Sequence, residues 1–168
     1  MARPPGDAQT ICAGTPPVTG ASAMYDLQTI GDTLAILGLQ ADYARAADSF
    51  DPARYAEVFT EDGILDASHC GFAVSVGRAD IAETMGNAFR QQTHNIHMTM
   101  NQRVLSVEGD RATGFAYFFQ RSILKNGGRT EFCGRYDDEY VRTAEGWKIH
   151  RRVLVELLPT VMEGYDIA

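Results

Sequence analysis

The sequence predicts an α+β domain in which about three N-terminal helices pack on a long antiparallel sheet. Two observations favour this class. Apolar residues recur at helical spacing in the first half of the chain, and four long segments suited to strands follow Gln92, separated by short turns that contain glycine. Helices followed by a meander of strands are typical of α+β folds, whereas α/β folds alternate the two.

The first 24 residues differ in character from the rest. They hold four of the six prolines and show neither a helical nor a strand period. Such a segment buries little apolar surface, so we expect residues 1–24 to be a flexible arm. Residues 25–168 are then a single domain, and Asp26 is a suitable N-cap for its first helix.

Three helical segments are expected. The first spans 27–50, the second spans 52–59 with Asp51 as cap and Pro52 at its first position, and the third begins at Asp80. The expected buried face of the first helix consists of apolar residues three or four apart, namely Ile30, Leu34, Leu37, Ala41 and Ala44. The same period places Asp48 on that face.

Strands account for the remainder. Short strands are expected at 64–67 and 72–76, after a turn at 61–63. Long strands are expected at 94–107, 111–124, 129–142 and 147–157. The separators Glu-Gly-Asp, Asn-Gly-Gly and Ala-Glu-Gly are typical of hairpins, so these four strands are predicted to form an antiparallel meander.

Composition excludes several partners. With 15 Lys and Arg against 22 Asp and Glu, the formal charge is −7, and no basic surface suited to nucleic acid is expected. No apolar run is long enough to span a membrane. Cys12, Cys70 and Cys133 have neither zinc-site nor disulfide-framework spacing, which indicates a reduced, cytoplasmic protein without a metal or other cofactor.

Four strings resemble the SnoaL-like members of the NTF2-like superfamily, whose fold is a cone-shaped α+β domain. They are YARAAD at 43–48, DPARYAEVFTEDG at 51–63, THNIHMTMN at 93–101 and GRYDDEYVRTAEGWKI at 134–149. The likeness covers roughly residues 26–157 and implies a bent sheet wrapped on the helices. That superfamily contains dehydratases, isomerases, cyclases and noncatalytic subunits.

Within it, the chain is most similar to the branch of bile-acid dehydratases and hexachlorocyclohexane dehydrochlorinases. This resemblance implies a His–Asp dyad of His97, early in the first long strand, and Asp48, at the end of the first helix. His97 would take a carbon-bound proton and Asp48 would orient it. Tyr43, five residues before Asp48, and Arg152, near the end of the last strand, would meet the substrate oxygen.

Alternatives remain for each of these residues. His94 is a rival for His97 with opposite strand parity, Tyr43 can instead pack on the sheet, and Arg152 can pair with Glu156 four residues along its strand. The polar group that some dehydratases carry on the next strand has no clear counterpart among Tyr117, Phe119 and Gln120. The acid that protonates the leaving group is therefore not identified.

The expected activity is that of a cofactor-free lyase, first of all a dehydratase acting on a hydrophobic cyclic substrate of steroid, terpenoid or polyketide type. An isomerase or cyclase using the same dyad is the near alternative. A noncatalytic binding subunit, as in ring-hydroxylating dioxygenases, and an epoxide hydrolase using Asp48 and Arg152 are the others. A homo-oligomer, dimer or trimer, is expected. The residues expected to line the substrate pocket are apolar or aromatic: Phe59, Met85, Phe89, Tyr117, Phe119 and Trp147.

Overall fold

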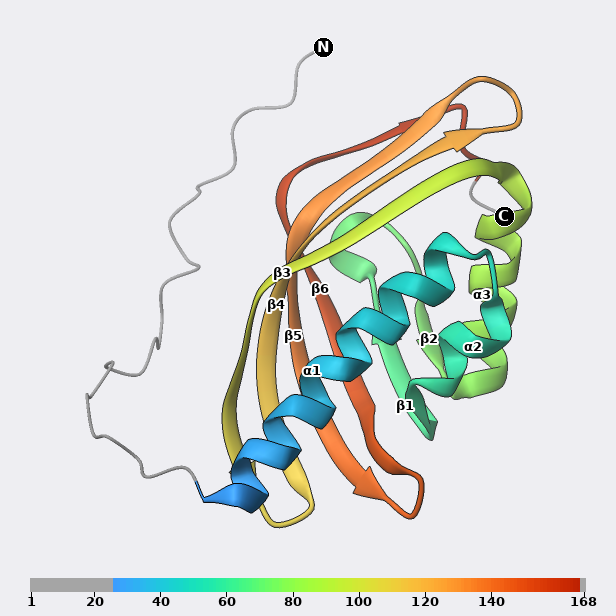
Figure 1. The fold of residues 1–168 in the computed structure, drawn as a ribbon. Helices are drawn as coiled ribbons and strands as arrows, with labels where there is room; N and C mark the ends of the chain where they lie inside the picture. Colours follow the sequence, from blue (N-terminus) through green and yellow to red (C-terminus); the bar gives the residue numbers. More distant parts are fainter. Residues whose placement is uncertain (1–25, 167–168) are drawn as a thin grey trace.

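The computed structural model describes residues 26–166, and the predicted arm at 1–24 lies outside them. Within these residues, three α-helices and a six-stranded mixed sheet form an α+β fold of NTF2-like type, which confirms the predicted class (Figure 1). The elements in chain order are α1 (Leu27–Asp48), α2 (Pro52–Glu57), β1 (Phe59–Asp66), a 3₁₀ turn η1 (Ser68–Cys70), β2 (Val74–Val76), α3 (Arg78–Gln91), β3 (Gln92–Glu108), β4 (Arg111–Leu124), β5 (Arg129–Thr143) and β6 (Gly146–Glu163). None of the described helices is long and apolar enough to cross a membrane.

Helix α1 begins as predicted but buries a different face. The Asp26 carboxylate accepts a hydrogen bond from the backbone N–H of Thr29 at 2.7 Å and caps the helix. The predicted apolar face is wrong, because Ile30 and Leu34 are 42% and 64% exposed. The face that packs on the sheet carries Asp32, Ile36, Gln40, Tyr43, Ala46 and Ala47. Two of these side chains are polar, so a search for apolar periodicity finds the wrong side of the helix.

The region after α1 follows the prediction with shifted boundaries. The Asp51 carboxylate caps α2 through the backbone N–H of Arg54, and Pro52 occupies the first turn. The turn expected at 61–63 lies inside β1, where the register with β6 shifts between Phe59 and Ile64. Strand β1 therefore starts five residues earlier than predicted.

The sheet order is β2-β1-β6-β5-β4-β3. Strands β3 to β6 form the predicted antiparallel meander, whereas β1 runs parallel to β6. The long strands bend part-way along, and α1 crosses the concave side while α2 and α3 lie beside it (Figure 1). Register irregularities in β3 and β5 accompany this curvature, as bulges do. Strand β6 continues to Glu163, well beyond the predicted end at 157.

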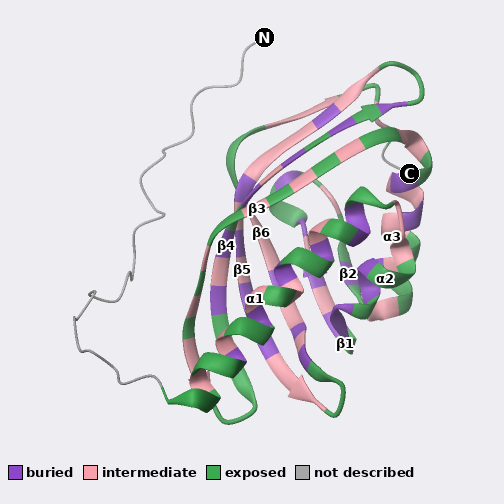
Figure 2. Cartoon of the chain, in the orientation of Figure 1, coloured by how far each residue is buried: buried purple, intermediate pink, exposed green. Residues whose placement is uncertain are grey.

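The core lies between α1 and the concave face of the sheet. Along β4, buried positions alternate with more exposed ones, with the even-numbered residues from Ala112 to Leu124 buried (Figure 2). The same period gives every long strand an inner and an outer face. Alternation of this kind decides which side chains can reach a cavity on the concave side.

Gly134 permits the close approach of β5 and β6. A Cβ at this position would overlap the backbone carbonyl oxygen of Val155 and lie 2.9 Å from the Phe118 ring. We expect Gly134→Ala to lower the free energy of unfolding by about 1–3 kcal/mol, because the backbones must separate. The measurement is urea denaturation.

Gly38 provides the matched control, because it lies in α1 with open space around it. Gly38→Ala is expected to raise stability by about 0.5–1 kcal/mol, since alanine restricts the unfolded chain more than glycine does. Equal effects of the two substitutions would contradict the role of Gly134 in the close approach of β5 and β6.

Candidate active site

A cavity opens on the concave side of the sheet, between the three helices, the short strand β2 and the strands of the sheet from β1 to β6. The volume within it that the centre of a water molecule can reach is about 130 Å³. Most of its wall is apolar, with contributions from Leu65, Met85, Ala88, Phe89, Phe118, Phe132 and Leu154. The polar side chains that face it are Tyr43, Tyr55, Thr84, Ser75, Gln92, Asn95, His97, Gln120, Thr130, Tyr136 and Tyr165. A mostly apolar wall interrupted by polar side chains at defined places is the usual form of a small-molecule site.

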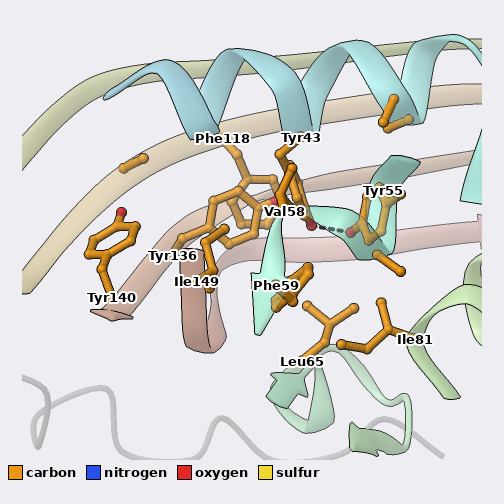
Figure 3. Close-up of a cluster of buried hydrophobic side chains, with 14 of the residues drawn as sticks. Tyr43, Tyr55, Val58, Phe59, Leu65, Ile81, Phe118, Tyr136, Tyr140 and Ile149 are labelled. Carbon is orange, nitrogen blue, oxygen red and sulfur yellow. Dashed lines mark hydrogen bonds between the residues drawn. The ribbon is translucent and has the colours of Figure 1, made fainter. Parts of the chain in front are cut away.

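Three tyrosines and one histidine gather at one end of this cavity. The Tyr55 hydroxyl, from α2, donates to the Tyr43 hydroxyl from α1 (Figure 3). The Tyr136 hydroxyl, from β5, lies 2.7 Å from Nε2 of His97 on β3. The Tyr136 ring stacks on Phe118 with centroids 4.1 Å apart, which fixes its orientation. The two consecutive helices α1 and α2 and the strands β3 and β5 thus bring three hydroxyls and an imidazole together.

Arg152 lies behind this cluster and does not line the cavity. Its guanidinium carbon stands 4.2 Å from the Tyr43 ring centroid and 4.0 Å from that of Tyr136, so the cation contacts both aromatic rings. The side chain is fully buried. Arg152 therefore acts on the cavity through these two tyrosines, and the direct contact with substrate expected from the sequence is not possible in this arrangement.

The charge of Arg152 is balanced by Asp138, the residue directly opposite on β5. Nε and Nη2 donate to the two carboxylate oxygens at 2.8 and 2.7 Å, and Nη2 also donates to Gln40 at 2.7 Å. The Tyr140 hydroxyl donates to the same carboxylate. The alternative pairing with Glu156 is wrong, because the neighbouring strand supplies a fully buried carboxylate at hydrogen-bond distance.

The surroundings set the protonation state of the cluster. Burial, together with the positive charge of Arg152, lowers the pKa of His97 to about 3. Burial raises the pKa values of Tyr55 and Tyr136 well above their usual range. At neutral pH the imidazole is therefore uncharged, while these phenols keep their protons.

Asp48 lies beside β3, and its carboxylate makes no hydrogen bond to the His97 ring. It accepts a hydrogen bond from Nδ2 of Asn95 at 2.8 Å. Partial burial raises the pKa of the Asp48 carboxyl, and the backbone N–H of His97 and the Asn95 amide oppose that rise. The period that placed Asp48 on the apolar face of α1 misplaced it, since the residue is exposed. The fold brings Asp48 and His97 to neighbouring positions without forming the expected dyad contact.

The choice of His97 over His94 agrees with the geometry. His97 lines the cavity, while the exposed His94 ring contacts only Thr93 among its described hydrogen-bond partners. As expected from strand parity, Ile96, Met98 and Met100 are exposed on the opposite face.

Only two of the six expected pocket residues line the cavity. Met85 and Phe89, on α3, do so. Tyr117 and Phe119 point to the outer face of the sheet, because β4 buries its even-numbered residues. Phe59 is fully buried in the core, and Trp147 donates from Nε1 to Asp32 at 3.0 Å, far along the sheet from the cavity lining.

Sequence reasoning missed several residues of the site. Tyr136, Asp138 and Tyr140 alternate on β5, and this pattern identifies a polar inner face once the direction of the strand's faces is known. Asn95 shares a face with His97, two residues away. Tyr55 lies in the helix predicted at 52–59, and nothing in the sequence indicates that its hydroxyl has a partner on α1.

The segment after β6 also contributes to the cavity. Tyr165 lines the cavity and meets Phe72 edge to face. The Gln91 side chain holds the backbone of Asp166 through two hydrogen bonds of 3.0 Å. Within residues 26–166, no three His, Cys, Asp or Glu side chains gather as metal ligands would.

Comparison with protein families agrees with this architecture. The model of the SnoaL-like domain matches residues 28–153. The chain belongs to the SnoaL-like family. Uncharacterized proteins from Mycobacterium tuberculosis and Mycobacterium bovis are 31% identical to it over 143 residues, which is 83% of this chain and 95% of theirs.

Solved structures extend the comparison. A candidate aromatic ring hydroxylase from Novosphingobium aromaticivorans is 38% identical, with a TM-score of 0.75 over 79% of this chain and 93% of that one. A type 2 hexachlorocyclohexane dehydrochlorinase is 20% identical, with a TM-score of 0.73 over 86% and 97%. At that identity the dehydrochlorinase shows a shared fold only. The resemblance predicted from the four strings is confirmed at the level of family and fold.

The low pKa of His97 predicts a pH-dependent stability. An unfolded histidine titrates near 6.5, so below about pH 6.5 the unfolded chain binds a proton that the native imidazole refuses until about pH 3. Acidification from pH 6.5 to 4.5 therefore destabilises the wild type through this group, by at most about 1.4 kcal/mol per pH unit. His97→Gln is expected to show a shallower slope in urea denaturation, with the other titrating groups common to both proteins. Parallel slopes would show that His97 titrates normally.

The buried ion pair predicts a large asymmetric effect. Arg152→Met leaves the Asp138 carboxylate buried without its cation, and we expect a loss of about 3–5 kcal/mol in unfolding free energy. The double variant Arg152→Met/Asp138→Asn removes the unpaired charge and is expected to recover part of that loss. A double variant no more stable than Arg152→Met would refute the pairing as the source of the effect.

Proposed function

We propose that this SnoaL-like protein is a cofactor-free lyase or isomerase, first of all a dehydratase, that acts on a hydrophobic cyclic substrate. The observation that carries the proposal is the uncharged imidazole of His97 beside tyrosine hydroxyls in an apolar cavity. A neutral imidazole can accept a proton from carbon, and water excluded from the site strengthens every polar contact with the developing charge.

In this proposal His97 is the general base. Nε2 is engaged by the Tyr136 hydroxyl, and no described residue hydrogen-bonds to Nδ1. In the tautomer whose Nε2–H donates to the Tyr136 oxygen, Nδ1 holds the free lone pair. It takes the proton from a carbon next to a carbonyl, and the bonding electrons form an enolate.

The next step differs between the two reactions. In a dehydratase the enolate expels a hydroxyl from the β-carbon, and the imidazolium returns its proton to that oxygen, so that water leaves. In an isomerase the proton returns to another carbon. Tyr43, whose hydroxyl oxygen accepts a hydrogen bond from Tyr55, supplies a hydroxyl donor within the same cavity for a substrate oxygen.

Arg152 and Asp48 have indirect roles in this scheme. Arg152 is a positioning residue that holds the rings of Tyr43 and Tyr136 and keeps His97 neutral. For Asp48 to orient His97, its carboxylate has to reach Nδ1 from its present place beside Asn95. The structural relatives that carry dehydrochlorinase names support a lyase by fold analogy alone.

A second candidate is a noncatalytic subunit of a ring hydroxylase. The observation in its favour is the name of the relative that is 38% identical. Such a subunit needs no catalytic base. This second hypothesis therefore predicts that replacing His97 changes no reaction rate measured with the purified chain.

The test uses bicyclic β-hydroxy ketones and follows both enone absorbance and exchange of the α-proton for deuterium by NMR. His97→Gln is expected to lower the catalysed rate by about 10²–10⁴, the contribution of a positioned general base. Asp48→Asn tests whether the dyad forms during the reaction. If it lowers the rate about as much as His97→Gln does, the Asp48 carboxylate has to contact the imidazole during turnover. Rates for wild type and His97→Gln that both equal the uncatalysed background would favour the noncatalytic subunit.

A further inference from the structure

A chain of side-chain hydrogen bonds runs along the sheet wall of the cavity. Nδ2 of Asn95 donates to Asp48 at 2.8 Å, and Nε2 of Gln120 donates to Oδ1 of Asn95 at 2.6 Å. The Thr130 hydroxyl lies 3.4 Å from Oε1 of Gln120 and 2.7 Å from the Ser122 hydroxyl. Asn95, Gln120 and Thr130 all line the cavity.

The Asp48 carboxylate sets the direction of this chain. An ionised carboxylate only accepts hydrogen bonds, so Asn95 has to present its NH₂ group to Asp48. Its carbonyl oxygen then faces Gln120, which must present NH₂ in turn, and the Gln120 oxygen is left for Thr130. Neither amide can reverse without placing two acceptors, or two donors, against each other.

With the hydrogen bonds in this direction, each of the two side-chain amides keeps one N–H without a partner among the described contacts. Each side-chain amide has two N–H groups, and the described contacts use one from Asn95 and one from Gln120. Gln120 is only 8% exposed, so little water is available to its second N–H. A buried donor without a partner costs about 1–3 kcal/mol, which an acceptor atom of a ligand in the cavity would relieve.

The two amides flank the imidazole. Gln120 is the residue directly opposite His97 in the β3–β4 ladder, and Asn95 precedes His97 by two residues on the same face. An oxygen bound by both amides places its neighbouring carbons beside the ring that takes the proton. Donors at that position also stabilise the negative charge that the oxygen acquires in an enolate.

The charge around the cavity selects the kind of oxygen. Among the described residues that line it there is no Lys or Arg, and Asp48 lies one hydrogen bond from the amides. A carboxylate ligand would meet a like charge without a cation to balance it. A neutral carbonyl meets donors alone.

We propose that Asn95 and Gln120 form a carbonyl-binding subsite, and that the substrates are hydrophobic cyclic ketones whose oxygen lies against β3 and β4. This inference takes the reaction from the proposed function. It adds that the protein recognises the substrate carbonyl, and that Asn95 and Gln120 are the residues that bind it.

The experiment compares 1-tetralone with tetralin, bicyclic compounds that differ by one carbonyl, and with 1,2,3,4-tetrahydro-1-naphthoate as the anionic probe. Affinities are measured by NMR titration for wild type and Gln120→Leu, with Ser122→Ala as the matched control at the far end of the chain. We expect Gln120→Leu to lower the ketone-to-hydrocarbon affinity ratio about three- to tenfold, the range of one neutral hydrogen bond. Ser122→Ala is expected to leave the ratio unchanged, and the naphthoate to bind more weakly than the ketone.

A second readout needs no variant. In the wild type, the side-chain NH₂ resonances of Asn95 and Gln120 are expected to shift on addition of 1-tetralone but not of tetralin. Unshifted resonances, no binding of the ketone, or a ratio equal in wild type and Gln120→Leu would each overturn the subsite.

Failure of the subsite and failure of the proposed function give different results. If ketone selectivity depends on Gln120 but turnover does not depend on His97, the result supports the carbonyl subsite and contradicts the proposed lyase activity. Turnover that depends on His97, with a ketone preference that ignores Gln120, supports the lyase and overturns the subsite.

Discussion

The guanidinium of Arg152 is fully buried against the rings of Tyr43 and Tyr136, and polar side chains from the sheet and from α1 compensate for that burial. A buried cation is costly unless it is paired and hydrogen-bonded. Asp138 pairs with it across the β5–β6 ladder, and Gln40 reaches it from α1. The helix is therefore attached to the sheet by polar contacts at its centre, which explains why its buried face is not apolar.

The same cation shapes the chemistry of the cavity. Its charge adds to burial in keeping His97 unprotonated, and its position holds two tyrosine rings so that their hydroxyls face the cluster. One donor, Nη1 of Arg152, has no partner among the described residues. A core built for stability alone gains more from apolar residues of similar volume, so this arrangement indicates a constraint from the site.

The elements were largely predictable because each has local signals. Asp26, Asp51 and Pro52 define helix starts, and glycine-containing turns separate the long strands. The site was less predictable from the sequence, because its contacts join residues about 40 to 110 positions apart, such as Tyr136 with His97 and Gln40 with Arg152. No period within one segment reports the register between two strands. The family resemblance identified His97 and Tyr43. Asp138 and Gln120 could be identified only from the pairing of the strands in the structure.

The two carboxylates nearest the site differ in a way that bears on the expected dyad. Asp138 is buried and held by Arg152, Gln40 and Tyr140, so it cannot leave its place without exposing a charge to an apolar interior. Asp48 is exposed, and Asn95 alone among the described side chains donates to it. It is the carboxylate that is free to turn toward His97. Because it also sets the direction of the amide chain through Asn95 and Gln120, any movement that assembles the dyad acts at once on the donors beside the imidazole. In the proposed scheme, the base and the carbonyl subsite are therefore coupled through the Asp48 side chain.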